Sequence, residues 1–205
     1  MGLRLIILGW WTPNFILRKE LENISDKTTC ALKALICKYS AKPVDDANPN
    51  QQPLRNIQDQ RAAMAQTQSK LVETLETLIG HEETVKQGRE TLFLVGQNLG
   101  KQARSRLGVG DSQNDLTKAA RILYRVLGIE FHLQWHNQSS ATVIIDKCAL
   151  AQQYSKLTCE VLSATDEGVI KGLHPNLTMN FKEYMTSGCN NCRAEINLNG
   201  TETLN

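Results

Sequence analysis

Four of the six cysteines lie within the last sixty residues, in an uneven spacing that packing in a core does not explain. They are Cys148, Cys159, Cys189 and Cys192, and the last two form a Cys-x-x-Cys pair where the sequence predicts a turn. Such a pair, together with two thiols from elsewhere, can hold a tetrahedral zinc ion or form a redox couple. Zinc is therefore the one cofactor that we expect, with a reactive thiol pair or structural thiols around a core or pocket as the alternatives.

The distance between Cys148 and Cys159 decides whether both thiols can bind one ion. The sequence predicts a helix over residues 149–172, which would hold the two residues roughly 15 Å apart along its axis. A break in this helix near residues 155–158 would remove the obstacle. The zinc site thus depends on where the helix begins.

Hydrolytic chemistry would need a nucleophile and groups that carry protons to and from it. Cys159 is the candidate nucleophile, and Asp166 and His174 are the candidate proton carriers. His132 and His136 are expected on the solvent face of a strand, with no third metal ligand near them in the sequence. The chain contains none of the GxSxG, Walker, GxGxxG or HExxH patterns, so the sequence indicates none of those catalytic classes.

Gly96 and Gly100 stand one turn apart inside an expected helix, where glycine is unfavourable. Glycine at both positions indicates close approach of either another helix or a ligand. If a ligand is bound, a small apolar molecule would fit between this helix and the sheet. The residues expected to line that pocket are Phe93, Gly96, Gly100, Leu123, Phe131 and Trp135.

Hydrophobic periodicity predicts the elements that position these residues. A period near 3.6 indicates helices over the first part of the chain, and a period of 2 begins at Ile129. The sequence thus predicts an α+β fold, in which a helical amino-terminal half precedes a ββαββ unit with an antiparallel sheet covered by helices. The expected helices span 14–40 (as two short helices), 54–79, 82–107, 113–127 and 149–172, and the expected strands lie within 129–135, 141–145, 175–181 and 192–198.

Three prolines among polar residues mark residues 41–53 as a loop or linker. We therefore expect an amino-terminal helical segment with this linker at 1–53 and a single α+β ligand-binding domain at 54–205. The apolar residues of the 54–79 helix form a narrow stripe, which suits packing against one neighbour or against a second copy of the chain.

The composition limits the classes of molecule that the protein is expected to bind. A net charge of +2, with basic residues scattered among acidic ones, and 5% aromatic residues argue against a nucleic-acid partner. Residues 1–11 are apolar but too few to span a bilayer, and packing on the protein is favoured over contact with a membrane surface. No export signal is evident, so we expect a cytoplasmic location with reduced thiols. Among these thiols, Cys30 and Cys37 are expected in a buried helical stripe.

A loose pattern of glycines, cysteines and acidic residues extends over roughly residues 85–198. It comprises residues 123–131, Cys148, Cys159, Glu167-Gly168, Gly172-Leu173, Pro175, and residues 185–188 ahead of Cys192. The pattern resembles the four-vinyl reductase-type hydrocarbon-binding domain, whose fold is shared by TRAPP vesicle-tethering subunits. It also resembles the L-2-amino-thiazoline-4-carboxylate hydrolases, especially at Asp166 and at His174-Pro175-Asn176.

The resemblance implies helices packed on an antiparallel sheet, a homodimer, and a pocket for an apolar or small ligand. It carries over Cys148, Cys159 and Cys192 as matching cysteines, whereas these families more often have a small or polar residue at the position of Cys189. The match at Asp166 is what links this chain to hydrolysis.

Three functions follow from these patterns. The leading hypothesis is a module that binds a small apolar molecule, in which a cysteine cluster holds a metal or senses redox state. The first alternative is a cysteine-dependent hydrolase of a small cyclic substrate. The second is an assembly or tethering subunit that uses the 54–79 helix and the amino terminus as contact surfaces.

Overall fold

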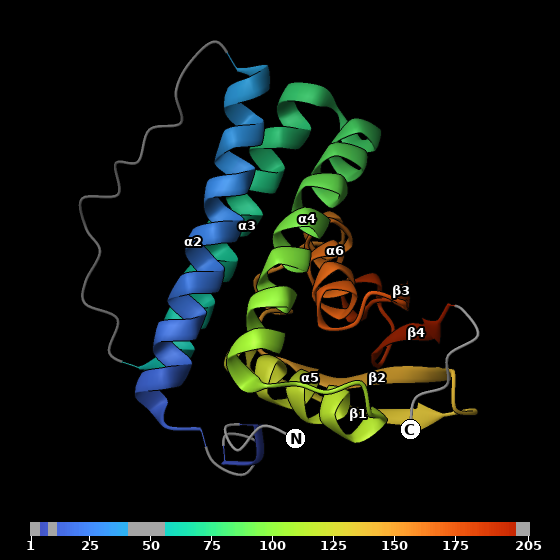
Figure 1. The fold of residues 1–205 in the computed structure, drawn as a ribbon. Helices are drawn as coiled ribbons and strands as arrows, with labels where there is room; N and C mark the ends of the chain where they lie inside the picture. Colours follow the sequence, from blue (N-terminus) through green and yellow to red (C-terminus); the bar gives the residue numbers. More distant parts are fainter. Residues whose placement is uncertain (1–4, 8–11, 41–55, 200–205) are drawn as a thin grey trace.

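A layer of long helices packs, through one further helix, onto a four-stranded sheet. The computed structural model describes residues 5–7, 12–40 and 56–199. In chain order its elements are α2 (Asn14–Tyr39), α3 (Ile57–Ile79), α4 (His81–Leu107), α5 (Gln113–Leu127), β1 (Ile129–Trp135), β2 (Ser140–Cys148), α6 (Lys156–Leu173), β3 (Leu177–Glu183), η1 (Met185–Ser187) and β4 (Cys192–Leu198). Figure 1 shows α2, α3 and α4 side by side, and α6 between α4 and the strands β3 and β4.

The sheet has the strand order β1-β2-β4-β3, and every neighbouring pair is antiparallel. Alternate residues of each strand are buried in the core under α5 and α6, as Cys192, Ala194 and Ile196 of β4 are. The opposite face carries ion pairs such as Lys182–Glu195 at 3.4 Å. The period of 2 in the sequence reflects this division, and the predicted α+β fold with an antiparallel sheet is confirmed.

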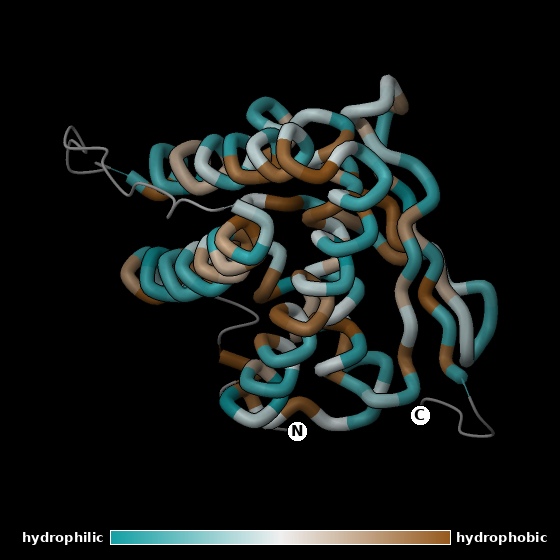
Figure 2. The backbone as a smooth tube through the Cα atoms, turned by 90° about the horizontal axis from the view of Figure 1, so that it is seen from above, coloured by the Kyte–Doolittle hydropathy of each residue, from teal (hydrophilic) through white to brown (hydrophobic). Residues whose placement is uncertain are grey.

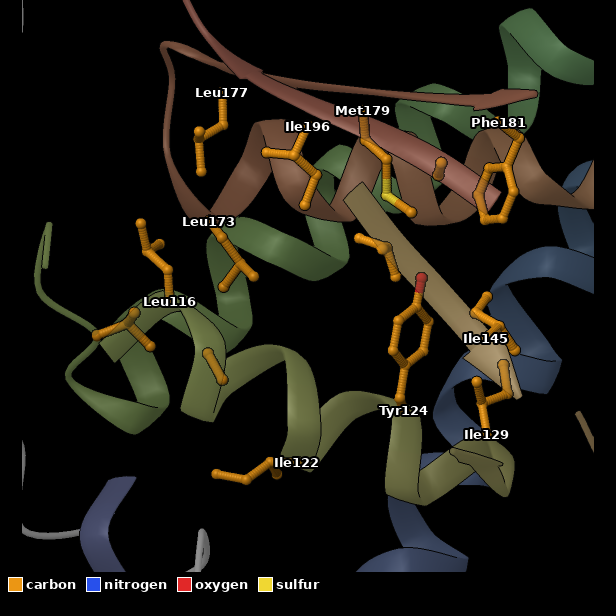
Figure 3. Packing of buried hydrophobic residues seen from close by; sticks show 14 of the residues in the cluster. Leu116, Ile122, Tyr124, Ile129, Ile145, Leu173, Leu177, Met179, Phe181 and Ile196 are labelled. Carbon is orange, nitrogen blue, oxygen red and sulfur yellow. The ribbon is translucent and has the colours of Figure 1, made fainter. Parts of the chain in front are cut away.

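The main core fills the space between the sheet and the helices α5 and α6 (Figure 3). Tyr124 projects from α5 toward Met179 of β3, and its ring packs edge-on against Phe131 with 5.0 Å between the ring centroids. Leu173 adds the carboxyl end of α6 to the same core. Burial of one such side chain contributes about 1.5–3 kcal/mol, so this core fixes α6 over the sheet.

Helices α4 and α6 touch through their backbones. A Cβ atom at Gly96 would overlap the carbonyl oxygen of Thr165, and a Cβ atom at Gly168 would overlap the carbonyl oxygen of Phe93. Gly100 meets the α6 backbone in the same way one turn later. The glycines therefore serve the approach of a helix, which was one of the two alternatives. They do not form the expected pocket wall with Phe93, because α6 lies between α4 and the sheet.

The expected pair of short helices over residues 14–40 is a single helix, α2. Residues 23–26 (Asn-Ile-Ser-Asp), which indicate a turn in the sequence, lie inside it, because Leu21 and Leu32 are buried against neighbouring helices on both sides of this stretch. Thr28 donates its hydroxyl to the carbonyl one turn earlier, at 2.8 Å, and so is satisfied within the helix.

The prediction that Cys30 and Cys37 form a buried stripe is wrong, because both are exposed. The face of α2 that packs on its neighbours runs through leucines at other positions, including Leu17 and Leu35. The expected linker at 41–53 lies outside the described residues.

The apolar stripe of α3 packs within the chain. Met64, Leu71 and Leu75 are buried, the last two in a core shared with α2, whereas Leu78 is exposed. Figure 2 shows hydrophilic and hydrophobic residues alternating along each helix. Accordingly, no helix among the described residues is long and apolar enough to cross a membrane.

Candidate ligand-binding site

A cavity of about 390 Å³ lies where α2, α4, α5 and α6 meet. This volume is typical of sites for small molecules, which occupy about 300–1,000 Å³. Leu123 lines it, as the sequence predicted for a pocket wall. Its apolar walls are formed by Ile16, Ile24, Leu99, Ala103, Leu107, Ile122, Leu123, Val126, Leu127, Val169, Ile170 and Leu173.

Polar side chains stand at the opening of this cavity between α2 and α4. Arg106, which is exposed, donates to the carboxylate of the half-buried Glu20 at 3.3 Å. Lys27 donates to the side-chain oxygen of Gln102 at 2.8 Å. These contacts link the two helices across the opening, while the interior stays apolar.

A second cavity, of about 80 Å³, adjoins the first and is lined by the side chains that could act as nucleophiles or carry protons. Cys148, Cys159 and Cys192 line it from β2, α6 and β4. Four residues line both cavities, namely Ile24, Leu127, Thr165 and Asp166. Asp166 thus stands between an apolar chamber and a group of thiols.

Cys148 and Cys159 reach the same cavity because α6 begins later than the sequence predicted. The chain turns after Cys148, at the end of β2, and α6 starts at Lys156. Ser155 caps the helix, since its hydroxyl oxygen accepts the backbone N–H of Thr158 at 3.1 Å. The break near residues 155–158 that would let both thiols approach is therefore present.

The carboxyl group of Asp166 forms no hydrogen bond with any residue that the structure describes. Burial raises the pKa of this carboxyl to about 7, and the neighbouring charge of Glu167 adds to the rise. Glu167 itself is held by Arg89, whose Nη2 donates to its carboxylate at 2.7 Å. A carboxyl that titrates near neutral pH and faces a cavity is typical of a functional site.

The thiols of the smaller cavity are not activated. Burial raises the pKa of Cys148 to about 11 and that of Cys159 to about 12. It also raises the pKa of Cys192, whose sulfur accepts the backbone N–H of Met185 at 3.2 Å. All three thiols are therefore protonated at neutral pH, in the form that is the weaker nucleophile and metal ligand.

The described residues contain no group of three or more His, Cys, Asp or Glu side chains placed to hold a metal ion. The four expected zinc ligands form no such group. Cys148, Cys159 and Cys192 line the smaller cavity, whereas Cys189 lies in the turn before β4 and does not line it. Binding of zinc by this chain, like the homodimer, stays a prediction.

His174 lies at the opposite end of α6 from Cys159. Its Nδ1 accepts the backbone N–H of Asn176 at 3.2 Å, and its Nε2 lies 3.4 Å from Oδ1 of Asp111. The helix between His174 and Cys159 spans roughly 22 Å, which puts the imidazole out of reach of the thiol. Of the two expected proton carriers, the structure thus places only Asp166 on the cavity of Cys159.

Phe131 and Trp135 line a separate cavity of about 40 Å³ between the sheet and the helices α5 and α6. The residues expected to line one pocket therefore lie apart, since Leu123 lines the large cavity and Phe131 and Trp135 line this small one. His132 is exposed on the opposite face of β1, where its Nδ1 lies 2.8 Å from Asp146, and His136 is exposed just after the strand, so their predicted solvent position is confirmed.

The sequence analysis missed Thr165 and the polar residues that close the smaller cavity. Gln68 donates to the hydroxyl of Thr28 at 2.7 Å and accepts the hydroxyl of Tyr154. The sequence did contain one signal for Gln68, because this polar residue falls at helical spacing on the apolar stripe that includes Met64 and Leu71. No local signal marks Thr165, since its position depends on the contact between α4 and α6.

Residues 60–195 match the protein family described as L-2-amino-thiazoline-4-carboxylic acid hydrolase. The chain belongs to this family. The resemblance found in the sequence is thereby confirmed over α3 to β4. Helix α2, which forms one wall of the large cavity, precedes the part that matches the hydrolase family.

Two solved structures share the fold of this hydrolase-family chain. Trafficking protein particle complex subunit 3 from Naegleria fowleri, covalently bound to palmitic acid, has a TM-score of 0.53 and 15% identity, over 71% of this chain and 97% of that one. The phenol-responsive sensory domain of the transcription activator PoxR, with phenol, has a TM-score of 0.51 and 14% identity, over 82% and 89%. Among curated proteins none matches. The fold shared with a TRAPP subunit was expected from the sequence.

Proposed function

We propose that the chain binds a small, largely apolar molecule in the cavity between α2, α4, α5 and α6. The observation that carries this proposal is the lining of that cavity. Its charged side chains are Glu20 and Arg106 at the opening and Asp166 within, and the walls between them are chiefly aliphatic. Such a chamber favours an apolar body, because transfer from water contributes about 25 cal/mol per Å² of apolar surface.

The molecules named with the two similar structures support this proposal. One of those proteins is covalently bound to palmitic acid and the other holds phenol, and each of these molecules has a largely apolar body. The aliphatic walls of the cavity in this chain suit a body of that kind.

Filling the cavity is expected to abolish binding. Ala103 lines the cavity from α4, so Ala103→Trp places an indole in the space of the ligand. We expect the neutral fluorescent probe N-phenyl-1-naphthylamine to bind the unaltered chain saturably, and Ala103→Trp to weaken this binding by at least about tenfold. Fluorescence titration measures both affinities.

Leu94→Trp provides the matched control, because Leu94 lies on the same helix but is 56% exposed. It adds the same indole and should leave the affinity for the probe unchanged. Equal binding by all three proteins, each shown to be folded by its thermal melt, would place the probe outside the cavity and remove the support for the proposal.

Cysteine-dependent hydrolysis is the second candidate, and one observation favours it. Cys159 and Asp166 are two turns apart on α6 and line the same cavity, where the carboxyl can accept a proton. In this scheme Asp166 takes the thiol proton as the sulfur of Cys159 attacks a ring carbon of the substrate, and the ring bond at that carbon breaks. The leaving atom then takes the proton from Asp166, and water releases the product and restores the thiol. The raised pKa of Cys159 opposes the scheme unless the substrate itself changes this environment.

The order in which the thiols react separates the two candidates. With iodoacetamide at about pH 7, we expect the exposed Cys30 and Cys37 to be labelled first and Cys159 at least about a hundredfold more slowly, because its thiolate is scarce. Peptide mass spectrometry over time gives the rates. Fast labelling of Cys159 would instead reveal an activated nucleophile and favour the hydrolase.

A further inference from the structure

Two polar groups on α6 lack partners at the place where the two cavities meet. The hydroxyl of Thr165 is buried and has no hydrogen-bond partner within the described part of the chain. The carboxyl group of the next residue, Asp166, likewise accepts no hydrogen bond from a described residue. Both residues line the large and the small cavity.

An unpaired carboxylate in an apolar wall is unfavourable, because it has lost water without gaining a donor. No lysine, arginine or histidine is found among the described residues that line the smaller cavity. In the larger cavity Arg106 is at the opening, where it pairs with Glu20. The charge of Asp166 therefore has no internal counterion there.

The other titratable groups around Asp166 do not compete for this role. Glu167, its neighbour on α6, is paired with Arg89 at 2.7 Å. The remaining groups are weak acids whose pKa is raised by burial, so they are neutral near pH 7. They are Tyr124 of α5, Cys148 of β2, Tyr154 ahead of α6, Cys159 of α6, Tyr184 after β3 and Cys192 of β4.

We propose that the site selects amines with an apolar body, whose ammonium group is bound by the carboxylate of Asp166 while the body fills the large cavity. This inference rests on the proposed function and adds the class of head group to it. An ammonium supplies both the missing positive charge and the missing donors. A carboxylate head would meet the charge of Asp166 and be rejected.

Three probes with the same tail test the head group, namely octylamine, octan-1-ol and octanoate. Each displaces N-phenyl-1-naphthylamine at about pH 8, where Asp166 is mostly ionised. We expect octylamine to bind at least about tenfold more tightly than octan-1-ol, and octanoate to bind most weakly. In Asp166→Asn, amine and alcohol should bind with similar affinity.

Asp26→Asn is the matched control, because it removes an exposed carboxylate from α2 that lines neither cavity, and it keeps Asp166. It should leave the preference for octylamine unchanged. Equal affinities for amine and alcohol in the unaltered chain, or a preference that Asp26→Asn removes and Asp166→Asn does not, would overturn the inference and leave the proposed function standing. Failure of the naphthylamine probe to bind at all would instead overturn the proposed function.

Discussion

Replacing Gly96 with alanine is expected to lower the free energy of unfolding by about 3 kcal/mol or more. The added methyl group would overlap the carbonyl oxygen of Thr165. Since this neighbour is backbone inside α6, a side-chain rotation cannot relieve the overlap and the two helices must separate. Alanine is favoured over glycine in a helix by about 1 kcal/mol, so the net loss understates the steric effect. Urea denaturation measures the change.

Gly88→Ala is the matched control on the same helix. There the added methyl would lie 2.7 Å from Cγ1 of Val161, a buried β-branched side chain that has little rotamer freedom but can shift more easily than the α6 backbone that Gly96 meets. We expect a smaller loss of about 1–2 kcal/mol at Gly88, where the gain in helix propensity offsets part of the contact. Equal stability of the two variants would contradict a backbone contact between α4 and α6.

This contact also determines the geometry of the site. The carbonyl that Gly96 approaches belongs to Thr165, whose side chain lines both cavities next to Asp166. On the other side of α6, Leu173 and Val169 meet the core over the sheet. A helix held from both sides keeps Asp166 at the boundary between the cavities, so the glycines contribute to function although they touch no ligand.

Elements with strong local signals could be predicted from the sequence. The helix over 113–127 has its predicted bounds, because Ser112 caps its start by accepting the N–H of Asp115 at 3.2 Å and Gly128 ends it in a left-handed conformation with φ 71°. The strand starting at Ile129 follows from its period of 2, since one face lies on the core.

Elements decided by distant contacts could not be predicted. The Asn-Ile-Ser-Asp stretch at 23–26 indicates a turn, yet α2 continues through it because leucines before and after it pack on other helices. In the same way, the sequence marked Gly96 and Gly100 for close approach but left the partner open, and α6 lies far from them along the chain.

The candidate site was predicted in part. The resemblance to the hydrolase family pointed to Asp166 and to Cys148, Cys159 and Cys192, and these four line one cavity. The wall that α2 adds was not predicted, because α2 precedes the matching residues and its packing is non-local. The part of the site that the sequence did not predict was therefore the large cavity. Without this cavity, the predicted residues would form only a cluster of cysteines around Asp166.

Asp166→Asn is expected to stabilise the folded chain at neutral and alkaline pH. The pKa of Asp166 rises from an ordinary 3.8 to about 7 on folding. Below about pH 4 the carboxyl is protonated in both the folded and the unfolded chain, so its ionisation has no effect on stability. Between about pH 4 and pH 7 only the unfolded chain releases this proton, so stability falls as the pH rises, and the full penalty applies above about pH 7.

The size of this effect follows from the pKa difference. Each unit corresponds to about 1.4 kcal/mol, which makes roughly 4 kcal/mol an upper limit for Asp166. Because its side chain borders two cavities, solvent reduces the penalty, and we expect a gain of about 2–3 kcal/mol for Asp166→Asn at about pH 8 and close to zero at about pH 4. Urea denaturation at both pH values measures the two gains.

Asp26→Asn removes a carboxylate from the exposed surface of α2 and should change stability by less than about 0.5 kcal/mol at either pH. A gain at Asp166→Asn that is equal at both pH values would mean that the charge of Asp166 carries no penalty, and that the carboxyl is already satisfied in the free protein. A gain confined to high pH would mean that the chain retains a destabilising carboxylate at a cavity boundary. A protein keeps such a group where a ligand uses it, and saturation with octylamine should then reduce the stability difference between Asp166→Asn and the unaltered chain, because the ligand stabilises only the chain that has the carboxylate to bind it.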